Sequence, residues 1–185
     1  MSDAIDVAAV VGSLRRESFT RRLVQGLISV ASPTIHIEIV GIGDLPLYNQ
    51  DLESAPPAPW LAFRERIRRC RAVLFATPEY NRSIPGVLKN AIDVGSRPYG
   101  KSVWRHKPAA VVSVSPGVMG AFGANHHLRQ CLVFLDMPTM QQPEAYIGGA
   151  DKLFDGAGQF VKPEMRDFCE RFVQSFEAWI RRYAG

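Results

Sequence analysis

Short apolar or β-branched runs alternate along this chain with segments whose apolar residues recur at helical spacing. The runs predict strands at Asp6–Val11, His36–Ile42, Ala72–Ala76, Ala109–Val114 and within Thr139–Ile147. The periodic segments predict helices at Thr20–Ala31, Trp60–Cys70, Gly86–Val94, around Ala124–Asp136 and at Pro163–Tyr183. Strands that alternate with helices form a parallel sheet covered on both faces. Five such strands predict an α/β three-layer sandwich, and the sheet order 2-1-3-4-5 fits this number of elements.

Size and composition predict one domain over residues 1–185. A chain of 185 residues can bury a full core but is too short for two independent enzymatic domains. Hydrophobic residues make up 46% and charged residues 22%, which argues against a disordered or fibrous class. The net charge of +4 comes from scattered arginines, so we expect an anionic small ligand and no nucleic-acid partner.

Cysteine usage and the first residues predict a cytoplasmic protein. Cys70, Cys131 and Cys169 are odd in number, far apart and in no Cys-x-x-Cys arrangement, which argues against a disulfide framework and a thiolate zinc site. The segment Met1–Asp6 is acidic, and no apolar run approaches membrane-spanning length, so we expect no membrane insertion. His127 and Cys131 are four residues apart but have no third ligand at helical spacing, so we expect no metal.

Polar turns follow three of the predicted strands, at Gly12–Ser18, Thr77–Pro85 and Ser115–Gly123. The predicted strand order is the flavodoxin-like one, and its ligand crevice lies at the carboxyl ends of the strands, where strands one and three diverge. We therefore expect the three turns to gather around one ligand.

The first turn has the chemistry of a phosphate site. It offers free backbone N–H groups at a helix start, the hydroxyls of Ser13 and Ser18, and a guanidinium from Arg15 or Arg16. It lacks the second glycine of Gly-x-Gly-x-x-Gly and the Gly-Lys-Ser/Thr ending of a P-loop, which disfavours a dinucleotide fold and a nucleotide hydrolase. The alternative is a serine N-cap beside a surface arginine.

The second turn has the chemistry of a binding edge for a flat molecule. Two prolines restrict its backbone, and the ring of Tyr80 can lie along a planar ligand beside Glu79 and Asn81. The alternative is a proline-stiffened loop whose polar side chains only cap the helix that begins at Gly86.

The third turn is glycine-rich. By itself it is weak evidence for a ligand site, and it supports one only because we expect it to lie beside the other two turns. Gly117 and Gly120 would allow a ligand to approach the backbone, and N–H groups near Ser115 would hydrogen-bond a carbonyl or a developing negative charge. No Gly-x-Ser-x-Gly elbow is present, so a serine hydrolase finds little support.

These motifs resemble the NADPH-dependent FMN reductase family, in particular its bacterial quinone, chromate and azo-compound reductases. The resemblance is carried by Gly12-Ser-Leu-Arg15 with Ser18, Pro78–Pro98, Ser115-Pro-Gly117, His127–Asp136 and Gln141–Ile147, and so spans nearly the whole chain. The Pro-Glu-Tyr-Asn block is its most specific part.

The resemblance implies a flavodoxin-like fold that holds FMN non-covalently. It implies a phosphate site at Ser13, Arg15, Ser18 and Thr20, an isoalloxazine border at Pro78, Glu79, Tyr80 and Asn81, and contacts to the far edge of the ring from Ser115 and Gly117. It also implies homodimers or homotetramers with FMN near a subunit boundary. Relatives usually have Asn at the position of Thr20, which can still offer a hydroxyl, and often Trp at Val94, which bears on the substrate wall. They often have Tyr-His at the position of His126-His127, and the loss of that tyrosine here favours a dimer over a tetramer.

We therefore expect an oxidoreductase in which NADPH or NADH delivers hydride to FMN and leaves before the acceptor binds, a ping-pong scheme. The acceptors expected are quinones, chromate, azo and nitro compounds, or free flavin. Arg97 and the loop Lys101–Lys107 are candidates for an anionic substrate or the NADPH ribose phosphate, the alternatives being a surface salt bridge and a solvated loop.

Two other functions remain open. One is a flavodoxin-like electron carrier without its own NAD(P)H turnover, and the net positive charge counts against it because flavodoxins tend to be acidic. The other is a flavin-free, phosphate-binding regulatory or scaffolding domain.

Overall fold

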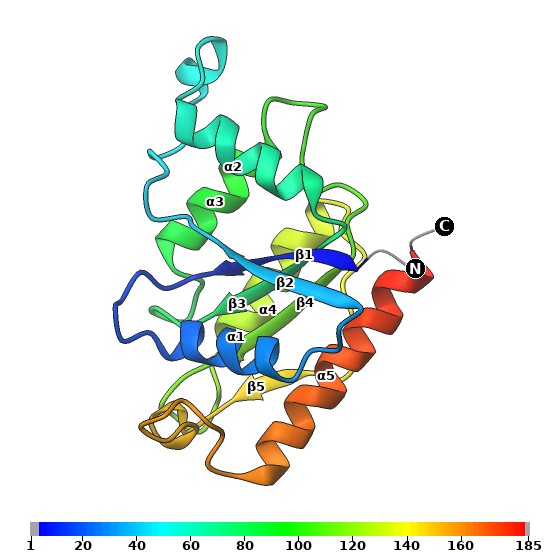
Figure 1. The fold of residues 1–185 in the computed structure, drawn as a ribbon. Coiled ribbons are helices and arrows are strands. Elements are labelled where there is room, and N and C mark those ends of the chain that lie inside the picture. Colours follow the sequence, from blue (N-terminus) through cyan, green and yellow to red (C-terminus); the bar gives the residue numbers. More distant parts are fainter. Residues whose placement is uncertain (1–3, 184–185) are drawn as a thin grey trace.

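A five-stranded parallel sheet forms the centre of the protein in a computed structural model that describes residues 4–183. The strands are β1 (Ile5–Val11), β2 (Ile35–Val40), β3 (Ala72–Thr77), β4 (Ala109–Val114) and β5 (Ala145–Ile147). They lie in the order β2-β1-β3-β4-β5 with every neighbouring pair parallel, as Figure 1 shows. The predicted order 2-1-3-4-5 and the flavodoxin-like class are confirmed.

Five α-helices cover the two faces of the sheet. They are α1 (Phe19–Ser29), α2 (Ala58–Arg69), α3 (Gly86–Ser96), α4 (Phe122–Phe134) and α5 (Pro163–Arg182), and two 3-10 helices, η1 (Gln50–Ser54) and η2 (Ala150–Lys152), complete the elements. Helices α1 and α5 cover one face, and α2, α3 and α4 the other (Figure 1). The sequence showed no period at η1, because a single 3-10 turn is too short to produce one.

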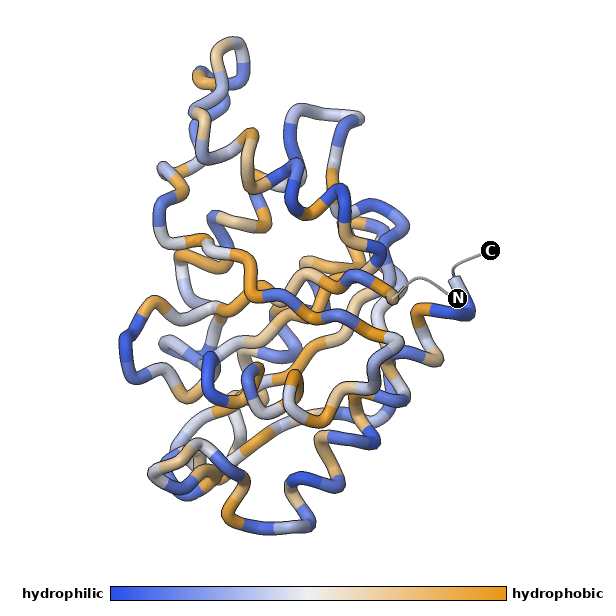
Figure 2. The backbone as a smooth tube through the Cα atoms, viewed as in Figure 1, coloured by the Kyte–Doolittle hydropathy of each residue, from blue (hydrophilic) through white to orange (hydrophobic). Residues whose placement is uncertain are grey.

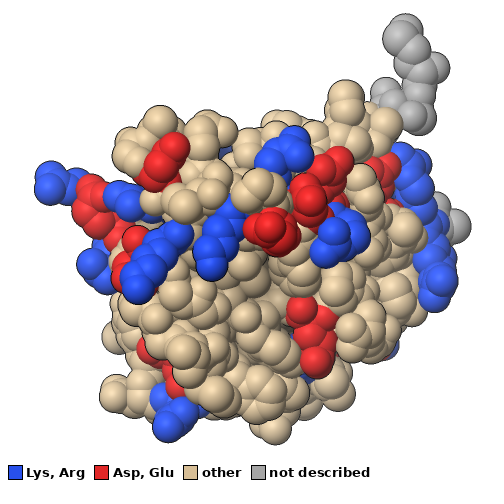
Figure 3. Space-filling model, turned by 90° about the horizontal axis from the view of Figure 1, so that it is seen from below, with Lys and Arg blue, Asp and Glu red and all other residues tan. Residues whose placement is uncertain are grey.

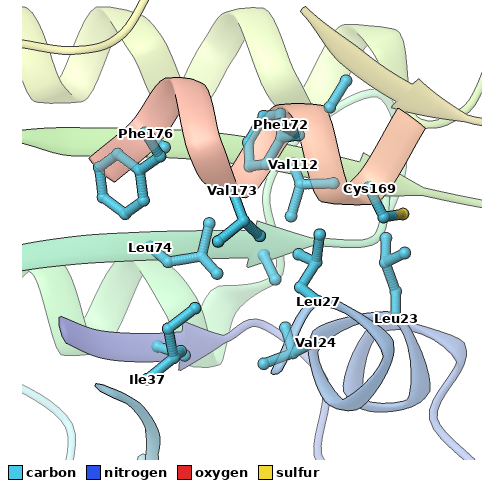
Figure 4. Packing of buried hydrophobic residues seen from close by; sticks show 14 of the residues in the cluster. Leu23, Val24, Leu27, Ile37, Leu74, Val112, Cys169, Phe172, Val173 and Phe176 are labelled. Carbon is cyan, nitrogen blue, oxygen red and sulfur yellow. The ribbon is translucent and has the colours of Figure 1, made fainter. Parts of the chain in front are cut away.

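The face under α1 and α5 is closed by aliphatic and aromatic side chains. Figure 4 shows Phe172 and Phe176 of α5 and Leu27 of α1 lying over Leu74 and Val112 of the strands. Phe172 and Phe176 are each 1% exposed. Burial of such rings contributes about 1.5–3 kcal/mol each, so this layer holds the long last helix against the sheet.

The opposite face is built around Trp104, which is fully buried against Phe75 and Phe63. Its indole N–H donates to the carbonyl of Ile92 at 2.9 Å. A Cβ on Gly95 would lie 2.4 Å from the Trp104 ring, so only glycine fits there. The loop 97–108 is thereby held to α3.

The polar surface is carried by the loops and the outer helix faces. Figure 2 shows hydrophobic residues in the central strands and hydrophilic residues at the periphery. On the underside of that view, Figure 3 shows basic and acidic side chains interspersed rather than a continuous basic stripe. Across residues 4–183, no helix combines the length and the apolar character that crossing a bilayer requires.

Candidate functional site

The three polar loops meet at one cavity of about 150 Å³ at the carboxyl ends of β1, β3 and β4. Its lining contains Ser13, Arg15, Ser18, Phe19, Thr20, Pro78, Glu79, Tyr80, Val114, Ser115 and Pro116. The expected gathering of the three turns is therefore confirmed. Among the predicted cofactor residues, Asn81 and Gly117 do not line the cavity.

Three hydroxyl side chains form the inner wall of this cavity. Ser13, Ser18 and Thr20 are only 5%, 2% and 2% exposed. Ser18 is the N-cap of α1, and its Oγ accepts from the backbone N–H of Arg21 at 3.1 Å. The hydroxyls of Ser13 and Thr20 have no hydrogen-bond partner within residues 4–183, although both residues line the cavity. Buried hydroxyls without protein partners at a helix N-terminus suit an anionic ligand.

The N-cap alternative is therefore correct for Ser18 and incomplete for the turn as a whole. Arg15 also lines the cavity, and its guanidinium lies 6.0 Å from the centre of the Phe19 ring. This contact keeps a positive charge beside the cavity, which suits an anionic ligand.

Tyr80 stands at the start of a tight hairpin turn. Tyr80 and Ser83 exchange two backbone hydrogen bonds, with N···O distances of 2.9 and 3.0 Å. The two residues between them, Asn81 and Arg82, have φ of 52° and 66°. Such a two-residue turn favours Asn at its first central position. Asn81 thus has a backbone role at the exposed tip, which accounts for its presence outside the cavity.

Helix α4 holds this hairpin from the side. The backbone N–H of Ala124 in its first turn donates to Glu79 Oε2 at 3.0 Å. The Oγ of Ser83 lies 2.7 Å from His127 Nδ1, in hydrogen-bonding contact. The alternative, in which the loop's polar side chains only cap the helix at Gly86, is wrong, because the α3 N-cap has no side-chain hydrogen bond and Glu79 binds α4 instead.

The third turn differs in detail from the prediction. The N–H of Ser115 donates to the carbonyl of Ile147 at 3.0 Å and is not available to a ligand. Gly120 has φ +56°, and a Cβ there would lie 2.4 Å from the carbonyl carbon of Tyr146. Gly120 therefore permits close packing on β5 and not the approach of a ligand. The space around Gly117 is open, since a Cβ would meet only Ser115 Oγ, at 3.8 Å.

Arg97, the candidate for contact with an anionic substrate or NADPH, lies away from the cavity. The Nε of Arg97 donates to Glu53 Oε1 at 2.7 Å and to the Tyr48 hydroxyl at 3.0 Å. The hydrogen bond from Tyr48, followed by that from Arg97, lowers the pKa of Glu53. Arg97 follows the last residue of α3, whose 11 residues rise about 16 Å from the loop at Pro85. The salt-bridge interpretation describes its contacts in the structure.

The cavity and its loops have the architecture of a known family. A family model described as NADPH-dependent FMN reductase matches residues 5–152. The chain belongs to this family. It is therefore an NAD(P)H-dependent oxidoreductase with FMN as cofactor and NAD(P)H as hydride donor, and the resemblance seen in the sequence is confirmed.

Individual relatives match this family member over nearly its whole length. It is 60% identical to a quinone reductase of Pseudomonas putida over 98% of this chain and 97% of that one. It is 44% identical to a 2-hydroxy-1,4-benzoquinone reductase of a Burkholderia species, over 96% and 97%. Its structure superposes on FerB, a flavoenzyme NAD(P)H:(acceptor) oxidoreductase from Paracoccus denitrificans, with a TM-score of 0.93, 40% identity and coverage of 97% and 99%.

The family's cofactor fits the residues of the cavity in part. A volume of about 150 Å³ is below the ~300–1,000 Å³ usual for small-molecule pockets, so the enclosed space suits the phosphate end of FMN and not the whole molecule. Tyr80, which is 47% exposed, marks the open side. No group of three metal-ligating side chains is found among the described residues.

Sequence reasoning missed some of the residues that build this family site. Phe19, Val114 and Pro116 line the cavity, and each directly neighbours a residue or strand that was identified. The sequence assigned His127 no role in the flavin loops, and its contact with Ser83 spans 44 positions. No local pattern in the sequence reports a contact of that range.

Proposed function

We propose that this FMN reductase family member is a quinone reductase that works by a ping-pong scheme. Bound FMN would supply the redox chemistry, accepting a hydride from NADPH or NADH and giving two electrons to an acceptor that enters after the nicotinamide has left. Because the cofactor supplies the reacting atoms, the protein's own work is to bind, orient and exclude water. The convergence of three loops on a cavity with unpartnered buried hydroxyls carries the proposal.

Each loop has a distinct task in this proposal. The phosphate would be held by Ser13, Arg15, Ser18 and Thr20, the ring would be bordered by Pro78, Glu79, Tyr80 and Asn81, and its far edge would meet Ser115 and Gly117. The hydroxyls and the guanidinium donate to phosphate oxygens, which are strong charge-assisted contacts. The turn 80–83 presents a fixed backbone edge to the ring, because both of its ends are hydrogen-bonded.

Quinones are the acceptors best supported, since the relatives from Pseudomonas putida and Burkholderia carry that activity in their names. Chromate, azo and nitro compounds and free flavin are further acceptors that an exposed flavin would reduce. We also propose that residues 1–185 act as one cytoplasmic FMN-binding domain and assemble as a homodimer or homotetramer, with the dimer favoured by His126 in place of the tyrosine that relatives often have.

The deciding experiment tests both the bound cofactor and the reaction. The purified protein should show flavin absorbance, oxidise NADPH or NADH only when a quinone is added, and give parallel double-reciprocal plots. The Ser13→Ala/Thr20→Val variant should need more FMN to reach the same rate. Bound flavin without NAD(P)H consumption would instead indicate an electron carrier, and a protein that acquires no yellow colour with FMN would indicate a phosphate-binding domain.

A further inference from the structure

A second cavity, of about 400 Å³, lies at the opposite end of the sheet from the FMN loops. Its basic lining residues are Arg68, Arg71, Arg105, His106 and Lys107. Lys107 precedes β4 and Ser115 follows it, so the six residues of that strand separate the two cavities by about 20 Å. In Figure 1 this end is the one where α5 ends, away from the loop that joins β1 to α1.

Two basic segments far apart in the sequence build this cavity. One is the end of α2 with Arg71, and the other is the loop Lys101–Lys107, for which the sequence left a solvated loop as the alternative. The structure joins them: Lys107 Nζ donates to the carbonyl of Arg68 at 3.2 Å and to the carbonyl of Cys70. The basic groups therefore face one space rather than two separate stretches of solvent.

The loop that carries three of these groups is held in place before any ligand arrives. The N–H of Val103 donates to Gly95 O at 2.9 Å, and the N–H of His106 donates to Asp136 O at 2.9 Å. Between them, Trp104 is fully buried. A ligand would find the cationic groups already positioned, so little ordering would have to accompany binding.

Three basic residues of this lining contact carboxylates outside the cavity. Arg105 and His106 lie 3.2 and 3.3 Å from Asp136, and Arg68 lies 3.5 Å from Glu65. These side chains are about half exposed or more, and exposed pairs of this kind contribute little. Neither carboxylate lines the cavity, and its described lining contains no acidic residue.

Lys107 is half-buried in this lining. Burial lowers its pKa, because desolvation disfavours the charged ammonium. An anion bound in the cavity would favour the charged form and so be stabilised by it in return. Ile180 and Pro108 add uncharged surface to the lining.

We propose that this cavity, which we name the amino-end site, binds a small polyanion of the oligophosphate class, such as inorganic pyrophosphate or the phosphate chain of a nucleotide. Guanidinium groups match phosphate oxygens with paired hydrogen bonds. A singly charged carboxylate would engage one guanidinium and leave the others uncompensated. The site is independent of the FMN cavity and of the proposed acceptor chemistry.

Isothermal titration with inorganic pyrophosphate, with FMN present at saturation so that the other phosphate site is filled, tests the proposal. The Arg68→Gln/Arg105→Gln variant should bind pyrophosphate at least about tenfold more weakly, which corresponds to ~1.4 kcal/mol. The control variant Arg166→Gln/Arg171→Gln loses the same charge from α5, at least nine residues or about 13 Å along the helix from Ile180, and should bind as the wild type does.

Three outcomes would overturn the amino-end site. One is no heat of binding at millimolar pyrophosphate, and another is equal loss of binding in the control variant, which would indicate a general effect of charge. The third is loss of binding in Arg15→Ala and not in Arg68→Gln/Arg105→Gln, which would assign the anion to the FMN cavity. Tighter binding of a short RNA than of pyrophosphate, abolished by the same two substitutions, would replace the proposal by a nucleic-acid interface.

Discussion

Replacing His127 by alanine tests whether α4 positions the hairpin that borders the flavin. His127 Nδ1 and Ser83 Oγ lie 2.7 Å apart, and this is the side-chain contact between α4 and the end of the turn that carries Tyr80. An exposed hydrogen bond of this kind contributes about 0.5–1.5 kcal/mol. If the turn must be ordered for FMN to bind, the dissociation constant of FMN should rise about two- to tenfold in His127→Ala.

The matched control is His126→Ala, because His126 is the neighbouring residue and contacts Tyr146 rather than the hairpin. Its Nε2 lies 2.9 Å from the Tyr146 hydroxyl. FMN affinity is measured by the quenching of flavin fluorescence when FMN binds the apoprotein.

The Ser83→Ala variant completes a double-mutant cycle with His127→Ala. The double variant should bind FMN no more weakly than either single variant does. Hydrogen exchange of residues 77–85 in the apoprotein should rise in His127→Ala and not in His126→Ala. Equal affinities for the two histidine variants, or additive effects in the cycle, would refute the reasoning.

Three further variants test other parts of the structure. Burial would raise the pKa of Glu177, but hydrogen bonds from two hydroxyls and an arginine outweigh it and lower that pKa. The ionised group therefore stabilises the fold above about pH 4.5, and this contribution is lost as pH falls through the lowered folded-state pKa. Glu177→Gln should cost about 1 kcal/mol at pH 7 by urea unfolding, and its cost should shrink steadily as pH falls below about 4.5. Gly95→Ala should cost about 1–3 kcal/mol because its Cβ would overlap Trp104, whereas Gly86→Ala, with nothing within 4 Å, should not lower the melting temperature. Arg97→Ala should retain FMN while weakening NADPH or acceptor use, and unchanged steady-state kinetics would leave Arg97 with its ion pair to Glu53 alone.

The sheet and its ligand edge could be predicted because both follow from local patterns. The run Ala72–Thr77 is buried at every position, as a central strand of a covered sheet must be. The polar turns at Ser13 and Tyr80 follow strands that are neighbours in the sheet, so parallel topology alone brings them together. The strand β5 was placed only within Thr139–Ile147, because three residues at the edge of a sheet give little periodicity.

The individual roles in the site depended on contacts that no local pattern reports. Asn81 has the residue type of a ligand donor, and the backbone of its turn requires the same residue type. Glu79 was assigned to the isoalloxazine border, and its carboxylate also accepts from the first turn of α4. A negative charge at a helix N-terminus is stabilising in itself. The presence of an acidic residue after β3 therefore did not tell a ligand contact from a contact that stabilises the fold.

The third loop shows how the fold limits the chemistry available to the flavin. The sequence suggested an N–H near Ser115 as a donor to the ring, but β5 uses that group, since a parallel strand takes up the N–H groups of its neighbour to the end of the ladder. The Ser115 hydroxyl in turn donates to the carbonyl of Gly117 at 3.1 Å. A donor to the ring from this loop must therefore come from the backbone after Pro116, where the space beside Gly117 is open. We expect Gly117→Pro, which removes that N–H, to change the flavin absorbance spectrum more than Ser115→Ala does, and the reverse order would show that the hydroxyl is the contact.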